Sequence, residues 1–163
     1  MSKPILSICI PTYRREEFLK LLVESIVEQD GFWSEVEIMI YNDPYEDNTQ
    51  SMVESFQHKY SNIRYHRNKQ RIWMIPSILD SVNMCSGEYV WFYSDDDIMS
   101  PLAIQTMLEV IKKEKSDLIL NRFLSFPAGA QINTQDIDYT WEITSVQWMD
   151  NYFKFLSDVS YSI

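Results

Sequence analysis

The sequence has 163 residues, of which 45% are hydrophobic and 23% charged, a balance that suits one folded domain with a full core and excludes a disordered chain. Its formal net charge of −10 argues against a nucleic-acid backbone or an anionic membrane surface as partner. The three glycines, Gly31, Gly87 and Gly129, are too few and too scattered for a P-loop or a dinucleotide-binding fingerprint.

Strands and helices are predicted to alternate along the first 120 residues. Short apolar runs predict strands at residues 5–10, 36–41, 63–66, 89–93 and 118–120. Apolar side chains at helical spacing predict helices at residues 15–28, from 49 onward and at 102–115, and a further helix is predicted at 75–84, ending before Gly87. We expect the first strand to be central, buried on both faces and ended by Pro11, and the run 89–93 to be buried as well. The pattern therefore predicts an α/β fold with a mostly parallel central sheet and helices on both faces.

The pattern changes after residue 121. Residues 123–126 and 137–141 are predicted to pair as an irregular hairpin, residues 148–156 to form an aromatic helix, and residues 159–163 to begin a further strand. We therefore expect two parts, residues 1–121 as one α/β domain and residues 122–163 as the start of a second, truncated region.

Three consecutive aspartates, Asp95, Asp96 and Asp97, follow the apolar run at 89–93. Carboxylates crowded in this way repel one another, and a cation among them relieves the repulsion. Hard oxygen ligands suit Mg²⁺ or Mn²⁺. An acidic turn that only caps the next helix is the alternative, and the aspartates taken alone leave both readings open.

Polar clusters follow three of the predicted strands, at residues 11–15, 42–43 and 94–97. Ligands of open α/β sheets bind at the carboxyl ends of the strands, so three clusters on one rim favour a binding site. Taken singly, each has an ordinary explanation: Thr12 as a helix cap, Asn42 and Asp43 as turn formers before Pro44. Together they suit a nucleoside diphosphate, because a tyrosine can stack on the base, an amide can meet its edge, and aspartates with a divalent ion can hold the diphosphate. Lys69 and Arg71 could add positive charge, although taken alone they are better explained as a solvated basic loop.

Three segments resemble the family 2 glycosyltransferases: residues 8–15, residues 40–49, and residues 87–101 with the triple aspartate of the family's DxD metal motif. The similarity covers residues 5 to about 120 in the family's order and spacing. It implies an A-type, Rossmann-like nucleotide-diphospho-sugar transferase fold, in which residues 1–121 bind the donor and residues 122–163 begin the acceptor side. It also implies transfer of a sugar from a nucleoside-diphosphate sugar, with UDP favoured, to a saccharide or lipid-linked acceptor. Inversion, dependence on Mn²⁺ or Mg²⁺ and a role in bacterial surface polysaccharide synthesis are implied as well.

The resemblance also implies roles for single residues. Pro11, Thr12 and Tyr13 would wrap the base and ribose, Asn42 would meet the base edge, and Asp95 would lie near the ribose or sugar. The predicted nucleotide-sugar-binding residues are Pro11, Thr12, Tyr13, Arg15, Asn42, Asp43, Arg71 and Asp95, and the predicted metal ligands are Asp96, the principal one, and Asp97.

The chain departs from the family pattern at several positions. Asn42 stands where aspartate is common, and asparagine can pair with uracil, thymine or cytosine. Ser94 replaces a frequent acid, Arg14 a frequent asparagine, and the loop at 68–71 lacks its usual glycine. No residue up to Ile163 sits in a recognisable general-base motif, so we expect the catalytic base beyond this position.

Two further readings stay open. One is a non-catalytic nucleotide-sugar-binding module that lacks the general base. The other is an interaction protein or homodimer that uses the aromatic residues of the C-terminal part, Tyr139, Trp141, Trp148, Tyr152, Phe153 and Phe155. We expect a cytoplasmic location, because the N-terminus has no signal peptide and no run reaches transmembrane length, and peripheral association with the inner membrane stays open.

Overall fold

The computed structural model describes residues 3–30, 32–120 and 144–146. The chain forms two compact units, residues 1–108 and residues 109–163. The expected hairpin of residues 123–126 with 137–141, the expected helix at 148–156 and the expected strand from 159 lie outside the described residues. The predicted domain boundary at residue 121 stays a prediction.

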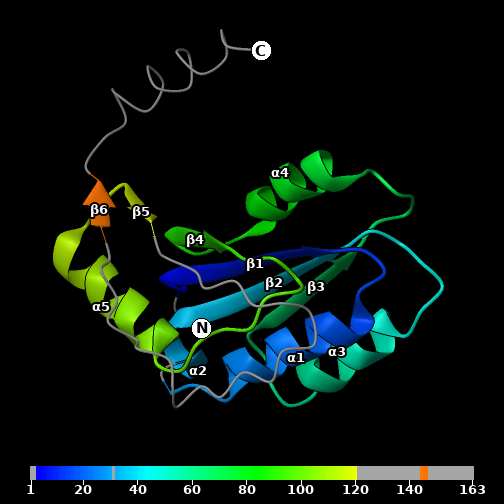
Figure 1. The fold of residues 1–163 in the computed structure, drawn as a ribbon, viewed down its shortest axis with the longest axis horizontal. Helices are drawn as coiled ribbons and strands as arrows, with labels where there is room; N and C mark the ends of the chain where they lie inside the picture. Colours follow the sequence, from blue (N-terminus) through cyan, green and yellow to red (C-terminus); the bar gives the residue numbers. More distant parts are fainter. Residues whose placement is uncertain (1–2, 31, 121–143, 147–163) are drawn as a thin grey trace, which may run out of the picture. The chain divides into compact units, whose positions relative to one another are not determined.

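The first unit is built around a four-stranded sheet in the order β3-β2-β1-β4 (Figure 1). Its strands are β1 (Leu6–Thr12), β2 (Val36–Asn42), β3 (Ile63–Arg67) and β4 (Tyr89–Phe92). All three pairings are parallel, as predicted. The chain moves outward from β1 through β2 to β3 and then crosses back to place β4 on the other side of β1, which creates a topological switch point between β1 and β4.

Strands β1 and β2 form the buried centre of the unit. Every residue of β2 is buried, and in β1 all except Pro11 are buried, which confirms the central position predicted for the first strand. Pro11 does not end the strand as expected but lies inside it, paired in register with Tyr41. The pairing of β1 with β4 reaches only Cys9, so the missing N–H of Pro11 falls where one edge of β1 has no ladder partner.

Strand β4 is less buried than the sequence indicates. Val90 is 39% and Phe92 45% exposed, while Tyr89 and Trp91 are half-buried. The physical reason is the position of the strand: it pairs with β1 alone among the described strands, so its apolar run marks an edge strand with one open face rather than a core strand. The prediction of a buried strand was wrong.

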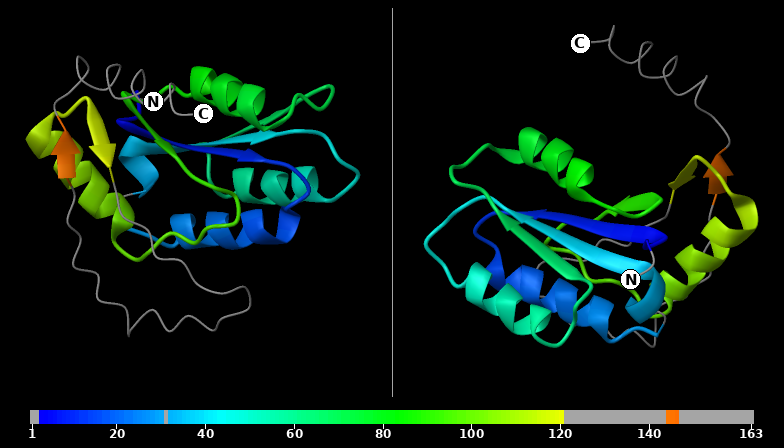
Figure 2. Two further views of the ribbon diagram at one scale, coloured as in Figure 1. Left: turned by 45° about the horizontal axis from the view of Figure 1, so that its top comes forward. Right: turned by 180° about the vertical axis from the view of Figure 1, so that it is seen from behind.

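Helices cover both faces of the sheet, as predicted (Figure 2). Helices α1 (Glu16–Val27) and α3 (Thr49–Gln57) lie on one face, and α4 (Met74–Met84) lies on the other. The predicted apolar stripe of α1 is buried in full, with Leu19, Leu22, Val23, Ile26 and Val27 inside. A short helix that the sequence did not indicate, α2 (Phe32–Glu35), precedes β2.

Helix α4 packs against β1 and β2 with a small polar face. Its buried residues are Ser77 and Ser81, and Cys9 of β1 donates its thiol hydrogen to the Ser81 hydroxyl at 3.1 Å. The larger apolar side chains of the helix point to solvent instead, and they include Ile75 and Leu79. The helix predicted at residues 75–84 is therefore confirmed, and the sequence analysis named no inner face for it.

A buried network fixes the start of β4 against β1 and β2. Glu37 accepts hydrogen bonds from the Ser7 hydroxyl, the Ser86 backbone N–H and the Ser86 hydroxyl, each at 2.6 Å. Arg64 lies 3.3 Å from the same carboxylate. Gly87 in turn donates its N–H to Ser7 Oγ at 2.8 Å, and a Cβ at this glycine would lie 2.6 Å from Ser7 Oγ and 2.7 Å from the Ser7 backbone nitrogen. Position 87 thus requires glycine, because its backbone lies too close to the backbone of Ser7 for a side chain to fit.

Helix α5 (Ala103–Glu114) contains the division between the two units, and its four predicted inward residues, Ile104, Met107, Leu108 and Ile111, are all buried. In the second unit, β5 (Leu118–Leu120) pairs antiparallel with β6 (Thr144–Val146), a strand that the sequence did not indicate. Within the described ranges, no helix has the length and apolar character needed to cross a bilayer.

Candidate functional site

Two of the three predicted polar clusters, those after β1 and β4, meet at the switch point, because the carboxyl ends of these strands are neighbours. Thr12 is the last residue of β1, and its hydroxyl donates a hydrogen bond to Asp95 Oδ2 at 2.7 Å. Asp95 is 6% exposed and Thr12 also 6%. This short contact links two segments that lie 83 positions apart, and it confirms that the first and third clusters share one rim.

Arg15 ties two of the three aspartates together. Its Nη1 lies 3.0 Å from Asp95 Oδ1 and 2.7 Å from Asp96 Oδ2. The Ser94 hydroxyl donates to the other oxygen of Asp96. The guanidinium is about half exposed, so this acidic pair is balanced by a cation that solvent and a ligand can reach.

The three carboxylates differ in their tendency to ionise. Burial raises the pKa of Asp95, and the hydrogen bond from Thr12 and the charge of Arg15 offset this only in part. The hydrogen bond from Ser94 and then the charge of Arg15 lower the pKa of Asp96. Burial, followed by the neighbouring charge of Asp96, raises the pKa of Asp97. Asp96 is therefore the most stable anion of the three.

The aspartates do not converge on one point. Across the part of the chain that the structure describes, no group of three acidic, histidine or cysteine side chains is placed to hold a metal ion. Asp96 nevertheless suits a hard cation, because its side chain is 44% exposed and stays ionised. Mg²⁺ and Mn²⁺ often bind through one or two carboxylates together with the phosphates of a substrate. The residues present fit a metal of that kind and do not form a complete cage of their own.

A stack of rings and guanidinium groups forms the second part of the site. Arg71 lies between two rings, 4.0 Å from the centre of Tyr13 and 3.8 Å from the centre of Trp73. Tyr45 meets Tyr13 edge-on at 5.8 Å, and Arg14 lies 4.3 Å from the centre of the Tyr45 ring. The loops after β1, β2 and β3 thus contribute to one continuous stack.

Two backbone positions in this stack are strained. Arg14 has φ 60°, where asparagine is tolerated better than arginine. Trp73 has φ 72° and ψ 171°, a region that is essentially restricted to glycine and costs other residues roughly 1–3 kcal/mol. Both are positions where surrounding contacts must hold the backbone. Strain of this kind concentrates at functional loops.

Asp43 anchors the loop that carries Arg71 and Trp73. One of its oxygens accepts from Asn68 Nδ2 at 2.7 Å, and the other accepts from the backbone N–H groups of Ile72 at 3.1 Å and Trp73 at 3.0 Å. The side chain is buried, at 3% exposed. Both carboxylate oxygens are occupied by the protein, so the geometry gives Asp43 the task of positioning the loop.

Asn42 ends β2 and is buried, and its Nδ2 donates to the Tyr65 hydroxyl at 2.8 Å. Pro11 lies inside β1, one residue before Thr12.

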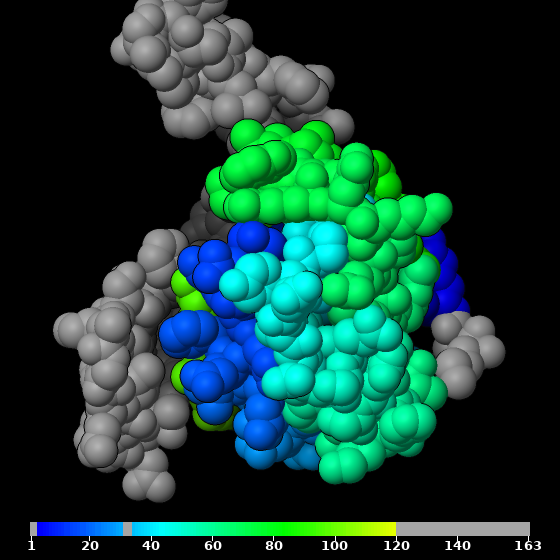
Figure 3. All heavy atoms as spheres, turned by 90° about the vertical axis from the view of Figure 1, so that its right-hand side faces the viewer, coloured from blue at the N-terminus to red at the C-terminus, as the bar shows by residue number. Residues whose placement is uncertain are grey.

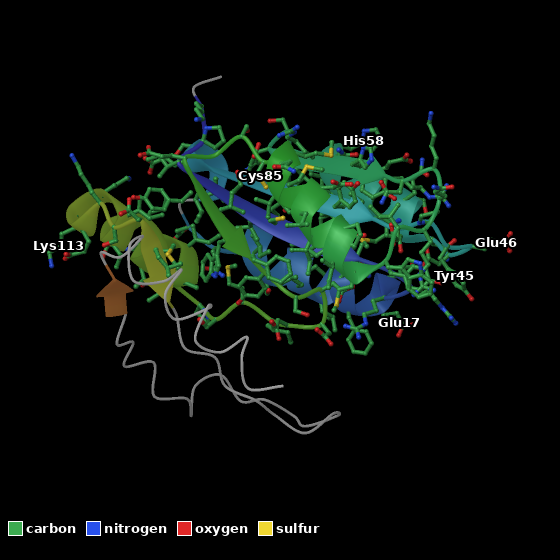
Figure 4. The ribbon with its side chains drawn as sticks, turned by 90° about the horizontal axis from the view of Figure 1, so that it is seen from above. Glu17, Tyr45, Glu46, His58, Cys85 and Lys113 are labelled. Atoms are coloured by element: carbon green, nitrogen blue, oxygen red, sulfur yellow. The ribbon has the colours of Figure 1, made fainter. Side chains whose placement is uncertain are left out.

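Beside the ring stack, a pocket of about 390 Å³ is lined by Pro44, Tyr45, Glu46 and Arg67. Figure 4 shows Tyr45 and Glu46 close together at one end of the sheet.

The structure brings most of the predicted residues to one rim. Thr12, Arg15, Asp95 and Asp96 are in direct contact, and Tyr13 and Arg71 stack on each other. Two members were missed by sequence reasoning, Tyr45 and Trp73. Tyr45 follows the turn at Pro44, and Trp73 is an aromatic residue two positions after Arg71 in the basic loop. A search for aromatic residues beside cations on the predicted rim would have found both.

Known proteins share the sequence pattern and the fold of this chain. The family profile described as "Glycosyl transferase family 2" matches residues 7–159. The abequosyltransferase RfbV of Salmonella typhimurium is 31% identical over 117 residues, which cover 71% of this chain and 35% of the relative. The GalNAc(5)-diNAcBac-PP-undecaprenol beta-1,3-glucosyltransferase of Campylobacter jejuni is 32% identical over 108 residues, which cover 65% of this chain and 34% of the relative.

Solved structures share the fold. The S. aureus TarS 1-349 structure in complex with UDP aligns with a TM-score of 0.69 at 23% identity, over 78% of this chain and 37% of that one. The mannosyltransferase PcManGT of Pyrobaculum calidifontis, in complex with GDP-Man and Mn²⁺, aligns with a TM-score of 0.61 at 15% identity, over 71% of this chain and 34% of that one. The chain spans about a third of the length of the relatives named above.

Proposed function

The chain belongs to glycosyl transferase family 2, and on that premise we propose that it binds a nucleoside-diphosphate sugar at the rim formed by Thr12, Tyr13, Arg15 and Asp95. The observation that carries the proposal is the contact of Thr12 with Asp95, which joins the first and third polar clusters at the switch point of a parallel sheet. As part of a glycosyltransferase, the site would present the sugar to an acceptor.

The base and ribose would lie along the end of β1, against Pro11, Thr12 and Tyr13. Asn42 directs its Nδ2 to Tyr65, which leaves its carbonyl oxygen to accept the N3–H of uracil. Cytosine offers no hydrogen at N3, whereas uracil and thymine both do, so this arrangement favours UDP or dTDP over CDP, and of these we propose UDP. The TarS structures with UDP and UDP-GlcNAc support the same choice.

Arg71 now covers the ring on which a base would stack. In the proposal the base takes the place of Arg71 on Tyr13, and the guanidinium turns to the diphosphate. Arg15 contributes a second positive charge beside the aspartates. The positive charges of Arg71 and Arg15 offset the repulsion that the acidic chain would exert on a phosphate-bearing ligand. Asp43 stays in place and holds the loop that carries Arg71.

A divalent ion, Mn²⁺ or Mg²⁺, would be held by Asp96 with support from Asp97, and Asp95 would stay near the ribose or sugar. When bound, such an ion supplies a Lewis acid that neutralises the departing diphosphate. The ionised state of Asp96 favours this role. The structure with Mn²⁺ in the mannosyltransferase supports metal use in this fold.

We expect inversion at the anomeric carbon, with the general base contributed from outside residues 1–163. The relatives named for abequose transfer and for an undecaprenol-linked acceptor support a saccharide or lipid-linked acceptor. A role in bacterial surface polysaccharide synthesis and a cytoplasmic location peripheral to the membrane belong to the same proposal. A nucleotide-sugar-binding module without chemistry is the second candidate, because among the described residues no carboxylate occupies a recognised base position.

The test is calorimetric titration of UDP, CDP, GDP and dTDP into the wild-type chain and a Thr12→Val variant. The variant keeps the shape of the side chain but removes the hydroxyl that binds Asp95. We expect UDP to bind most tightly and Thr12→Val to lose most of that binding. The matched control is Thr106→Val, a half-buried threonine of α5. Absence of binding with all four nucleotides, or equal binding by Thr12→Val and wild type, would overturn the proposal.

A further inference from the structure

Helix α4 carries an apolar surface that the described core does not use. Ile75, Leu79 and Val82 follow one another at helical spacing, and they are 66%, 60% and 37% exposed. Met74, at 72% exposed, widens the stripe at the start of the helix. The opposite side of the helix packs on the sheet through small serines. Figure 3 shows α4, in green, as a ridge at one side of the described part of the first unit.

The part of the chain just before α4 is basic, although the chain as a whole is acidic. Residues 64–84 contain four basic residues, Arg64, Arg67, Lys69 and Arg71, and one acidic residue, Asp80. The other residues contain ten basic and 23 acidic side chains. The net charge of −10 therefore says little about this surface. Its charge sign is opposite to that of the whole chain, and all four basic residues are exposed.

We propose that the outer face of α4 and the basic loop at residues 67–71 form a surface that lies on an anionic lipid bilayer. An apolar helix face beside exposed basic residues is the pattern of helices that rest in the membrane interface. Trp73, 64% exposed at the junction of loop and helix, belongs to the residue type that favours this interface. The positive charge of the loop complements anionic headgroups, and a neutral or basic protein partner would not require it.

This surface adds to the proposed function, and the membrane proposal rests on that function for one point, a lipid-linked acceptor. Trp73 stacks on Arg71, and Arg71 stacks on Tyr13 at the donor rim. The lipid-facing surface therefore begins where the donor site ends. A protein lying on this face would hold its donor close to the headgroup region, where the saccharide of a lipid-linked acceptor is found.

The experiment is co-sedimentation of the chain with vesicles of phosphatidylethanolamine and phosphatidylglycerol, and with vesicles of phosphatidylcholine alone. The test variant is Ile75→Gln with Leu79→Gln. The matched control is Phe18→Gln with Leu21→Gln, because these α1 residues are 54% and 51% exposed on the other face of the sheet. We expect binding to the anionic vesicles that falls at least tenfold in the α4 variant, persists in the α1 variant and is much weaker with phosphatidylcholine. Lys69→Gln should weaken it by about fivefold, the usual effect of one basic residue.

Three results would overturn the proposal. The first is no vesicle binding by the wild-type chain, or equal binding by both double variants. The second is a concentration-dependent dimer in light scattering that only the α4 variant abolishes, which would assign the face to a second copy of the chain. The third is a lower melting temperature in the α4 variant alone, which would mean that the chain itself covers the stripe. Titration of UDP on the same samples separates this proposal from the donor site, since the α4 variant should bind UDP as the wild type does.

Discussion

Replacing Asp43 by alanine tests how the rim is held in place. The change removes a buried carboxylate that accepts three hydrogen bonds, two of them from the backbone N–H groups of Ile72 and Trp73. The strained conformation of Trp73 depends on such contacts. Without them the loop that carries Arg71 should open, and Arg71 should leave its place beside Tyr13.

The magnitude follows from the number and kind of bonds. A hydrogen bond to a charged group is worth roughly 1.5–3 kcal/mol. Water would satisfy the freed N–H groups once the loop opens, and the strain at Trp73 would be released, so the full sum is not lost. We therefore expect Asp43→Ala to lower the free energy of unfolding by about 3 kcal/mol. Asp43→Asn should cost nearly as much, because an amide nitrogen would face the donors of the loop.

The assay is urea unfolding, combined with hydrogen exchange at the amides of Ile72 and Trp73. The control is Asp47→Ala in the same connection, where the carboxylate accepts one hydrogen bond from the Thr49 backbone at 3.1 Å and the loss should be about 1 kcal/mol. If Asp43→Ala costs no more than Asp47→Ala, or if the two amides keep their protection, Asp43 does not anchor the loop.

Further predictions concern the start of β4, a buried acid and the ring stack. Gly87→Ala should destabilise the first unit by about 2 kcal/mol or more, because the new Cβ meets the backbone of Ser7. Adding Ser7→Ala should not restore the melting temperature, since the contact with the Ser7 backbone remains. Burial alone would raise the pKa of Glu37, but the hydrogen bonds from Ser7 and Ser86 and the charge of Arg64 outweigh burial and lower this pKa below the ordinary 4.5. The ionised Glu37 side chain therefore stabilises the fold above pH 4.5, and this stabilisation is lost as the pH falls through the folded-state pKa. The unfolding curves of wild type and Glu37→Gln should thus converge in acid and diverge towards neutral pH. Arg71→Ala should weaken UDP binding about tenfold yet leave uridine binding equal or tighter, because the base no longer competes with the guanidinium for the Tyr13 ring. If uridine binding fell as much as UDP binding, the base would not displace Arg71 from Tyr13.

The layered fold could be predicted because the hydrophobic pattern of each segment in the first 120 residues matches the strand or helix that it forms. The apolar run before Thr12 gives a strand buried on both faces, and the stripe from Leu19 to Val27 gives a helix with the correct inner side. The error at β4 and the unpredicted outer face of α4 have one origin. Apolar character shows that β4 and α4 are regular elements, but it does not show what covers Phe92 or Leu79, since that depends on neighbours outside the local sequence.

The site was predicted in part. Its location follows from topology, because the carboxyl ends of parallel strands meet at one edge, and the contact of Thr12 with Asp95 bears this out. The task of Asp43 could not be predicted, since it depends on a loop that returns to the rim 29 residues later. The stack of Arg71 between two rings was equally hidden, because it requires the backbone of Trp73 in a conformation that the residue type disfavours.

Binding of UDP in the presence and absence of Mn²⁺ tests the central claim most directly. Calorimetric titration would compare wild type, Asp96→Ala and the control Asp30→Ala, an exposed aspartate in the turn after α1. The account predicts that Mn²⁺ strengthens UDP binding to wild type and to Asp30→Ala, that Asp96→Ala loses this gain, and that Mn²⁺ alone binds weakly because no complete cage is present among the described residues. Equal strengthening by Mn²⁺ in all three proteins, or no UDP binding in any of them, would contradict it.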